Sequence, residues 1–463
     1  MGTEESLLKL PLAETFNLET AVCSHGLFMM SPNRWDPLSR SLSRPLHLSN
    51  SLDNTDIPSV SVDVTICQPQ QDPHSLRIEV RNSASGSAPS LSQEQQDALL
   101  AQVKRMLRLS EADERNVREF KRIVRQVAQE EGEETQYMED FSGRVFRSPT
   151  LFEDMVKCML LCNCQWPRTL SMARALCELQ WELQHCSPSI SEDFIPQTPA
   201  GKESKRRQKV SKVASKLTSR IAESKASSED YMNLKLDCAG VLEENVQPSF
   251  PQNDIESDLH GLNELSTTDP PSARDRIGNF PSPRELANLD ESFLAKRCNL
   301  GYRAGRILKL ARGIVDGQIQ LRELEDMCNE ASLTAYVKLA EQLSQINGFG
   351  PFTRNNVLVC IGFYHVIPTD SETIRHLKQV HARNCTSKTV QMIAESIYGK
   401  YAPFQFLAYW SELWHFYEKR FGKLSEMPYS DYKLITATNE KCNSLQLSSK
   451  ESEALSSFVD QQK

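Results

Sequence analysis

Residues 345–370 combine a glycine-rich turn with one carboxylate, and both are residue types that can do chemistry. Apolar residues at helical spacing predict a helix that is interrupted by the turn Asn347-Gly348-Phe349-Gly350. Pro351 suits the first position of a second helix. Gly348 and Gly350 would let backbone N–H groups approach a phosphate, and the positive end of the second helix would point at the same spot. The pattern predicts a phosphate-binding hairpin, although a Gly-x-Gly turn alone fits an ordinary tight turn equally well.

Asp370 supplies the carboxylate and stands just before another helical run, in the order Pro368-Thr369-Asp370. A carboxylate can stabilise positive charge that develops beside it in a transition state. The simpler alternative is a helix N-cap, and Thr369 with Glu372 could instead form a capping box. Capping and catalysis are compatible, so the cap does not exclude a catalytic role.

A helix-hairpin-helix followed about twenty residues later by Pro-x-Asp resembles the base-excision DNA glycosylase superfamily. In that family the aspartate just past the hairpin is the catalytic carboxylate, which corresponds here to Asp370. Other segments are similar to the 8-oxoguanine DNA glycosylase branch, namely Ser148–Glu153, Asn163–Arg168, Phe280–Ser282 and Leu300–Ala304.

The resemblance implies three roles inside a DNA duplex. Asn163 would fill the hole left by an extruded base, Arg168 would contact the orphaned partner base, and Tyr302 would wedge the helix open. An amide, a guanidinium and an aromatic ring are suited to these tasks. The expected DNA-binding residues are Asn163, Arg168, Tyr302, Arg303, Asn347, Gly348, Phe349, Gly350 and Thr353.

One departure from that branch concerns the mechanism. Bifunctional relatives carry a lysine two residues after the second hairpin glycine, where this chain has Phe352. No other lysine lies between Lys338 and Lys378, and the guanidinium of Arg354 stays protonated. The expected activity is therefore hydrolytic removal of a damaged base, a purine, without strand cleavage. The alternative is an inactive protein that binds lesions or acts as a scaffold on DNA.

The base pocket is predicted on the segment 399–410, which resembles the last catalytic helix of the 8-oxoguanine branch. Gln405 and Trp410 are the candidates for holding a flipped base, although the amide is displaced by one residue from the family register. Most other aromatic residues of this segment fit a buried helix core instead.

The charge of the chain is unevenly distributed. The net charge is −8, which does not suit a DNA-binding protein, but residues 274–423 carry 20 lysines and arginines against 15 acidic residues. This local excess keeps DNA contact plausible.

The predicted fold class is α+β, with an N-terminal antiparallel β domain followed by an all-α helix-hairpin-helix glycosylase domain that a disordered insert splits. Strand-like patterns occur at 16–20, 23–30, 60–65 and 76–80. The predicted organisation is a β domain (1–90), a charged helical connector (91–141), the first catalytic part (142–186), the insert (187–273), the second catalytic part (274–427) and a disordered tail (428–463).

Thirteen cysteines show no disulfide framework, and a reducing compartment is expected. Only Cys385 and Cys442 follow Asp370, so the four-cysteine iron–sulfur loop of other branches is missing. No metal or other cofactor is expected, although the resemblance allows a monovalent cation on the hairpin carbonyls. A zinc site fits poorly with the spacing of Cys158, Cys162, Cys164, Cys177 and Cys186.

The expected partner is double-stranded DNA with a damaged base, bound by a monomer with no membrane contact. Lysines and arginines gather at 202–216 within the insert, which is consistent with nuclear import or with a DNA tether. A solvated charged linker is the alternative. Nuclear localisation is the expectation.

Overall fold

The computed structural model describes residues 6–12, 16–48, 60–83, 89–132, 136–185, 277–327 and 332–436. The predicted insert with its basic cluster, and the end of the chain after residue 436, lie outside these ranges. Within them, no helix is both long enough and apolar enough to cross a membrane.

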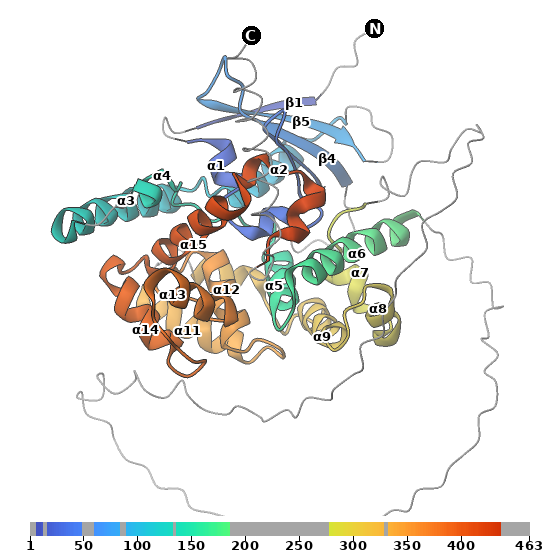
Figure 1. Cartoon of the computed structure of the whole chain (residues 1–463). Helices are drawn as coiled ribbons and strands as arrows, with labels where there is room; N and C mark the ends of the chain where they lie inside the picture. Colours follow the sequence, from blue (N-terminus) through green and yellow to red (C-terminus); the bar gives the residue numbers. More distant parts are fainter. Residues whose placement is uncertain are drawn as a thin grey trace, which may run out of the picture. The chain divides into compact units, whose positions relative to one another are not determined.

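Five antiparallel strands form one sheet near the N-terminus, which confirms the α+β class. They are β1 Ser6–Pro11, β2 Arg34–Asp36, β3 Ser41–Leu48, β4 Val60–Cys67 and β5 Ser75–Asn82, in the order β1-β5-β4-β3-β2 (Figure 1). Alternate side chains of β4 and β5 are buried, and Val64 stands opposite both Val80 of β5 and Arg44 of β3. The period of two therefore places one face of the sheet against the core.

Two of the four predicted strand segments are helical instead. Residues 16–20 enter α1 (Leu18–Val22), and residues 23–30 contain the short 3₁₀ helix η1 (Gly26–Met29). The reason is local: the side chain of Asn17 accepts a hydrogen bond from the amide of Thr20 at 2.9 Å and starts α1. The apolar residues of both segments are buried, so apolar content alone did not separate helix from strand.

The charged segment after the sheet forms α2 (Gln93–Leu107), α3 (Glu111–Glu131) and α4 (Gln136–Asp140). A charged helical connector was predicted there. Each of its helices buries an apolar face, for example Leu99 and Val103 of α2 and Phe120 of α3. The faces of α3 and α4 join a second core together with the C-terminal helices. The charges cover only the outer side of these helices.

The helical part has one segment before the insert and one after it. The start of the second segment hydrogen-bonds to α6, the last helix of the first. Before the insert lie α5 (Leu151–Leu161) and α6 (Trp166–His185), and after it α7 (Pro283–Ala287), α8 (Glu291–Arg297), α9 (Arg303–Val315) and α10 (Leu321–Asp326). The amide of Gly278 donates to the carbonyl oxygen of Cys177 at 3.1 Å, and that of Asn279 donates to Gln180 Oε1 at 2.8 Å. A Cβ on Gly278 would lie 2.1 Å from Gln180 Oε1, so glycine is required for this approach.

The C-terminal half contains the hairpin and the last helices. Its elements are α11 (Leu333–Ser344), α12 (Pro351–Ile361), α13 (Ser371–His381), α14 (Val390–Tyr398), η4 (Gly399–Tyr401), α15 (Gln405–Phe421), η5 (Leu424–Glu426) and η6 (Tyr429–Leu434). The disordered tail was predicted to begin at residue 428, but η6 corrects that boundary. Tyr432 is buried there, and its carbonyl oxygen accepts a hydrogen bond from Trp166 Nε1 at 3.0 Å.

A buried ion cluster joins the sheet to α5. Arg44 belongs to the inward-facing row of β3, and its guanidinium contacts both carboxylate oxygens of Glu153 at 3.2 and 2.9 Å. Lys157 lies 2.7 Å from the same carboxylate, and all three side chains are buried. Burial alone would raise the pKa of Glu153, but the charges of Arg44 and Lys157 outweigh it and lower the pKa to about 2.

We expect Glu153→Gln to lower the free energy of unfolding by about 3–5 kcal/mol at neutral pH, because it leaves Arg44 and Lys157 buried without a counter-charge. Urea denaturation measures the change. Glu119→Gln is the matched control, since Glu119 pairs with Arg122 on the surface of α3 and its loss should change stability by less than about 0.5 kcal/mol. Equal effects of the two changes would contradict this role of the cluster.

The pH dependence of the Glu153 contribution follows from its lowered pKa. Its stabilisation is complete above the ordinary value of 4.5 and is lost as the pH falls towards about 2. The Gln variant should therefore lack this part of the acid-induced destabilisation.

Candidate functional site

The predicted hairpin is present between α11 and α12. Gly348 has φ +94°, and an added Cβ would lie 2.7 Å from Arg306 Cδ. Pro351 is the first residue of α12, and no side chain caps this helix. The amides of Gly350, Phe352 and Thr353 therefore have no acceptor within the helix. They form a site that can accept an anion at the positive end of the helix.

Residues of the hairpin differ in what they can offer to a ligand. The side chain of Asn347 is exposed, whereas Phe349 and Thr353 are 4% and 1% exposed. Phe349 and Thr353 were predicted to bind DNA, but their side chains belong to the core. Only their backbone can face a ligand.

Tyr302 precedes α9 and is 50% exposed. Its ring lies between two guanidinium groups, with the Cζ atoms of Arg303 and Arg306 each 4.7 Å from its centroid. The aliphatic part of Arg306 also contacts the hairpin at Gly348. Arg306, which the motifs did not single out, thus places the exposed aromatic ring beside the hairpin.

The loop between α5 and α6 reaches the same surface. Asn163 is exposed and has a left-handed φ of +47°. Arg303 is buried, and its guanidinium donates to the carbonyl oxygen of Asn163 at 3.1 Å and to that of Cys162. Arg168 is exposed and donates to the carbonyl oxygen of Asn299 at 3.3 Å. Arg303, predicted to bind DNA, instead holds the loop that carries Asn163.

These contacts join three segments that are distant in the sequence. The segments are 162–168, 299–306 and 347–350, and together they carry eight of the nine predicted DNA-binding residues, all except Thr353. The connected segments thus carry the exposed side-chain amide of Asn163, the guanidinium of Arg168 and the ring of Tyr302. They also lead into the unpaired backbone amides at the start of α12.

Asp370 is the N-cap of α13. Its Oδ1 atom accepts from the amide of Thr373 at 2.9 Å and from Thr373 Oγ1 at 3.1 Å, and its own amide donates to Thr373 Oγ1. The capping box therefore forms between Asp370 and Thr373, and the alternative box of Thr369 with Glu372 is wrong. Both cap bonds from Thr373 end on Oδ1, so neither involves Oδ2.

The surroundings of Asp370 affect its charge in opposite directions. Partial loss of hydration beside the surrounding protein raises the pKa of the Asp370 carboxyl, while the hydrogen bonds from Thr373 oppose this rise. The residue is exposed to solvent, which limits the effect of this loss of hydration. Thr373 Oγ1 also lies 3.1 Å from the hydroxyl of Tyr409, which connects the cap to α15.

Phe352, at the position where relatives have lysine, is half-buried in the first turn of α12. The α12 segment contains no lysine, and Arg354 is its only cation. The side-chain Nδ2 atom of Asn356 donates to the carbonyl oxygen of Phe352 at 2.9 Å. No amine is therefore supplied by this helix.

The two predicted pocket residues lie at the start of α15. Gln405 is buried, and its Oε1 atom has no hydrogen-bond partner among the described residues. Trp410 is half-buried, and its Nε1 atom donates to the carbonyl oxygen of Ser24 at 2.8 Å. Its ring lies 4.5 Å from the ring of His25. The N-terminal segment therefore contacts this helix through Ser24 and His25.

His25 is an electrically neutral neighbour of Trp410. Burial lowers its pKa to about 3, and the charge of Arg108 adds to the effect. Arg108 itself donates to the carbonyl oxygens of Val359 and Cys360 at 3.0 and 2.7 Å, at the end of α12. The charged connector thereby secures the hairpin helix, a contact that the sequence pattern did not reveal.

No family model and no curated protein matches the chain. Solved structures do match. A 3-methyladenine DNA glycosylase from Archaeoglobus fulgidus is 15% identical, with a TM-score of 0.47 over 87% of this chain and 98% of the other. MBOgg1 in complex with a low-affinity DNA ligand is 16% identical, with a TM-score of 0.45 over 89% and 96%. An 8-oxoguanine glycosylase/lyase from Clostridium acetobutylicum is 12% identical, with a TM-score of 0.39 over 83% and 98%. At TM-scores below 0.5, these matches do not assign the chain to a family.

The two hairpin glycines should respond differently to substitution. We expect Gly348→Ala to cost about 1–2 kcal/mol of stability, because its φ is positive and a Cβ would displace Arg306. Gly350→Ala should cost less than about 1 kcal/mol, since Gly350 has φ −66° and no atom within 4 Å of an added Cβ. Urea denaturation of both variants measures the difference, and a larger loss at Gly350 would contradict this geometry.

Proposed function

We propose that the protein is a monofunctional DNA N-glycosylase of base-excision repair that removes a damaged purine by hydrolysis, with Asp370 as the catalytic carboxylate. The observation that carries the proposal is the exposed carboxylate of Asp370, which caps α13 through Oδ1 in a chain that also has the predicted hairpin. The motif resemblance supports the same activity.

DNA would be held at the surface formed by segments 162–168, 299–306 and 347–350. The free amides at the start of α12 would bind a backbone phosphate, which fixes the duplex without reading its sequence. Tyr302 would enter the base stack, and Asn163 and Arg168 would bind the edges left unpaired by the flipped nucleotide. The exposure of these three side chains supports these roles.

The reaction would be a substitution at the sugar C1′ atom. The N-glycosidic bond breaks, its electron pair leaves with the base, and positive charge develops on the sugar ring. The negative charge of Asp370 would stabilise that sugar cation. A water molecule then bonds to C1′ and releases a proton, which leaves an abasic site. Phe352 provides no amine for a Schiff base, so the strand should stay intact.

The base pocket would include Gln405, Trp410 and His25. Trp410 offers a flat ring for stacking, and the unpaired Oε1 atom of Gln405 offers an acceptor. His25 is neutral, so the pocket would discriminate by stacking and hydrogen bonds rather than by charge. This composition fits an extended, uncharged ring system such as a purine. We further propose a monomer that acts in the nucleus.

The second candidate function is a DNA-lesion-binding protein without catalysis. It is favoured by the replacement of lysine by Phe352, since a protein that only reads damage needs no nucleophile. Asp370 distinguishes the two functions because a pure binder needs no carboxylate beside the sugar.

The main test measures base excision on duplexes that each carry one oxidised, alkylated or deaminated base. We expect strand breaks only after alkali treatment, at one class of lesion, and a 100- to 1000-fold loss of rate in Asp370→Asn, which is roughly the cost of losing one electrostatic contact to a transition state. Asparagine is as good an N-cap as aspartate, so the variant should remain folded. Excision at the wild-type rate in Asp370→Asn would overturn the catalytic assignment.

Binding assays separate the second candidate. Tight lesion binding that depends on Tyr302, without excision of any base by the wild-type chain, would identify a damage reader. Loss of excision in Tyr302→Ala with unchanged non-specific binding would support the wedge.

Treatment with borohydride during the reaction tests the hydrolytic route. Borohydride reduces a Schiff base to a stable covalent adduct, and we expect none to form on a substrate that the wild-type protein excises. An adduct visible on a denaturing gel would mean that another amine of the chain attacks C1′.

A further inference from the structure

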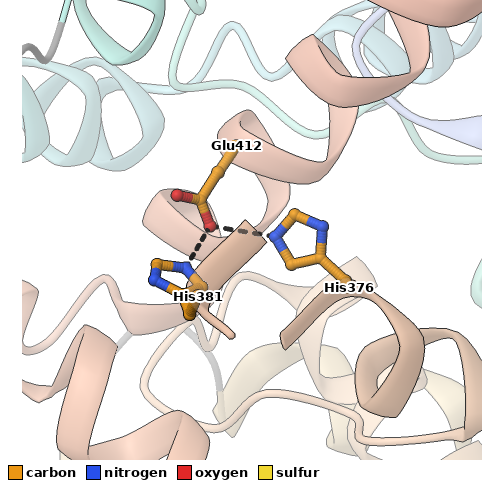
Figure 2. Close-up of side chains that lie close together, drawn as sticks. All are labelled: His376, His381 and Glu412. Carbon is orange, nitrogen blue, oxygen red and sulfur yellow. Dashed lines mark hydrogen bonds and ion pairs between the residues drawn. The ribbon is translucent and has the colours of Figure 1, made fainter. Parts of the chain in front are cut away.

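Two histidines and a glutamate point at one another between α13 and α15 (Figure 2). Figure 2 shows His376 and His381 of α13 facing Glu412 of α15. Each histidine Nε2 atom lies 2.9 Å from the same oxygen, Glu412 Oε2. One donor atom from each residue lies within 4.8 Å of the others. Three potential metal ligands thus share one small volume.

The cluster is enclosed, and its members are held in place. The side chain of His376 is fully buried, and those of Glu412 and His381 are 13% and 24% exposed. The ring of His376 stands edge-on to Tyr409 and Phe416, with centroids 5.6 and 6.1 Å away. Aromatic packing therefore orients this imidazole, a task that a hydrogen bond to the second ring nitrogen usually performs at metal sites.

Two tyrosines support the carboxylate. The hydroxyl of Tyr398 donates to Glu412 Oε2 and lies 3.2 Å from His381 Nε2, and Tyr137 donates to Glu412 Oε1 at 3.4 Å. Both oxygens of the Glu412 carboxylate are therefore held in place by hydrogen bonds.

The donor set matches a particular class of ion. Two imidazole nitrogens and one carboxylate oxygen are the ligands of many zinc sites, with bonds of roughly 2.0–2.1 Å. Tetrahedral ligands at that bond length lie about 3.3 Å apart. The two 2.9 Å N···O separations would need to open by a few tenths of an ångström, and the two histidine nitrogens, which lie within 4.8 Å of each other, would need to settle at the same spacing. This small movement is available to His381, which is the last residue of α13.

An entry path is also present. Glu412 lines a cavity of about 520 Å³, together with Tyr137, Val380 and His415. An ion could reach the carboxylate from this cavity without unfolding the chain, and a water molecule could occupy the fourth ligand position from the same side.

We propose that His376, His381 and Glu412 bind one Zn²⁺ ion that ties the C-terminal end of α13 to α15. The bound ion would have a structural role. Asp370 begins α13 and His381 ends it, so the ion would fix the far end of the helix that carries the carboxylate. Metal binding itself does not depend on the proposed glycosylase activity.

The test begins with full-length protein stripped of metal by a chelator and free of any histidine tag. Titration with Zn²⁺ in competition with a chromophoric chelator should give one ion per chain and a higher melting temperature. In His381→Gln the affinity should fall by about 100-fold or more, as expected when a ligand is lost. Co²⁺ in place of Zn²⁺ should give the intense visible bands of a tetrahedral site, and these should disappear in the same variant.

Control variants keep the result specific. His415→Gln changes an imidazole on the same helix and cavity but outside the ligand set, so it should bind Zn²⁺ like the wild type. Glu412→Gln is a second ligand variant in case His381→Gln fails to fold, which circular dichroism would reveal. Absence of stoichiometric binding by the wild type would overturn the proposal. Wild-type affinity in both ligand variants would overturn it as well, since the metal would then sit elsewhere, for instance on cysteines.

The outcome is independent of the excision assay. A chain that binds Zn²⁺ through these residues but excises no base would leave the zinc site standing and overturn only the glycosylase. The reverse result would remove the zinc site alone.

Discussion

The structure depends on a pair of adjacent acidic residues that are both buried. Glu153 and Asp154 follow each other in α5, and each is compensated by a different part of the chain. Glu153 contacts Arg44 of the sheet, and Asp154 accepts hydrogen bonds from Arg147 and from the amide of Ser148 at 2.7 Å. Burying a charge is costly unless a partner is supplied. The burial of α5 in the core therefore depends on both the sheet and the segment before it.

This constraint extends to the proposed site because α5 connects to it at both its end and its side. Its C-terminal end leads into the loop of Asn163, which Arg303 holds. Its side packs against α12, where the Sγ atoms of Cys158 and Cys360 lie 4.0 Å apart. The N-terminal sheet thus acts as more than an appended domain. It orients one helix, and that helix positions both the loop and the hairpin helix.

The sequence predicted those elements that have local signatures. Glycines and Pro351 located the hairpin, and the residues before α13 located Asp370. Features that depend on distant partners were missed. Arg44 lies in the inward row of β3 and breaks the apolar alternation that marks a strand. The charge of Arg44 is neutralised there by Glu153, which is distant in the sequence. The cluster around Glu412 was not predicted for the same reason. Its two histidines are five residues apart, which fits no helical ligand pattern, and Glu412 lies 31 residues beyond His381. Arg303 is a further example. It was predicted to contact DNA, but it is buried and supports the loop that carries Asn163.

The close approach of Gly278 to α6 has a consequence for the evolution of the chain. The segment between His185 and Ile277 leaves from the end of α6 and returns beside Cys177 and Gln180 of the same helix. The entropy of closing a long connection grows only with the logarithm of its length, at about 0.6 kcal/mol for each doubling. Insertions and deletions there cost the fold little, provided that Gly278 and Gln180 remain. The helices before and after this segment are joined by these two contacts, so their packing does not depend on the length of the sequence between them.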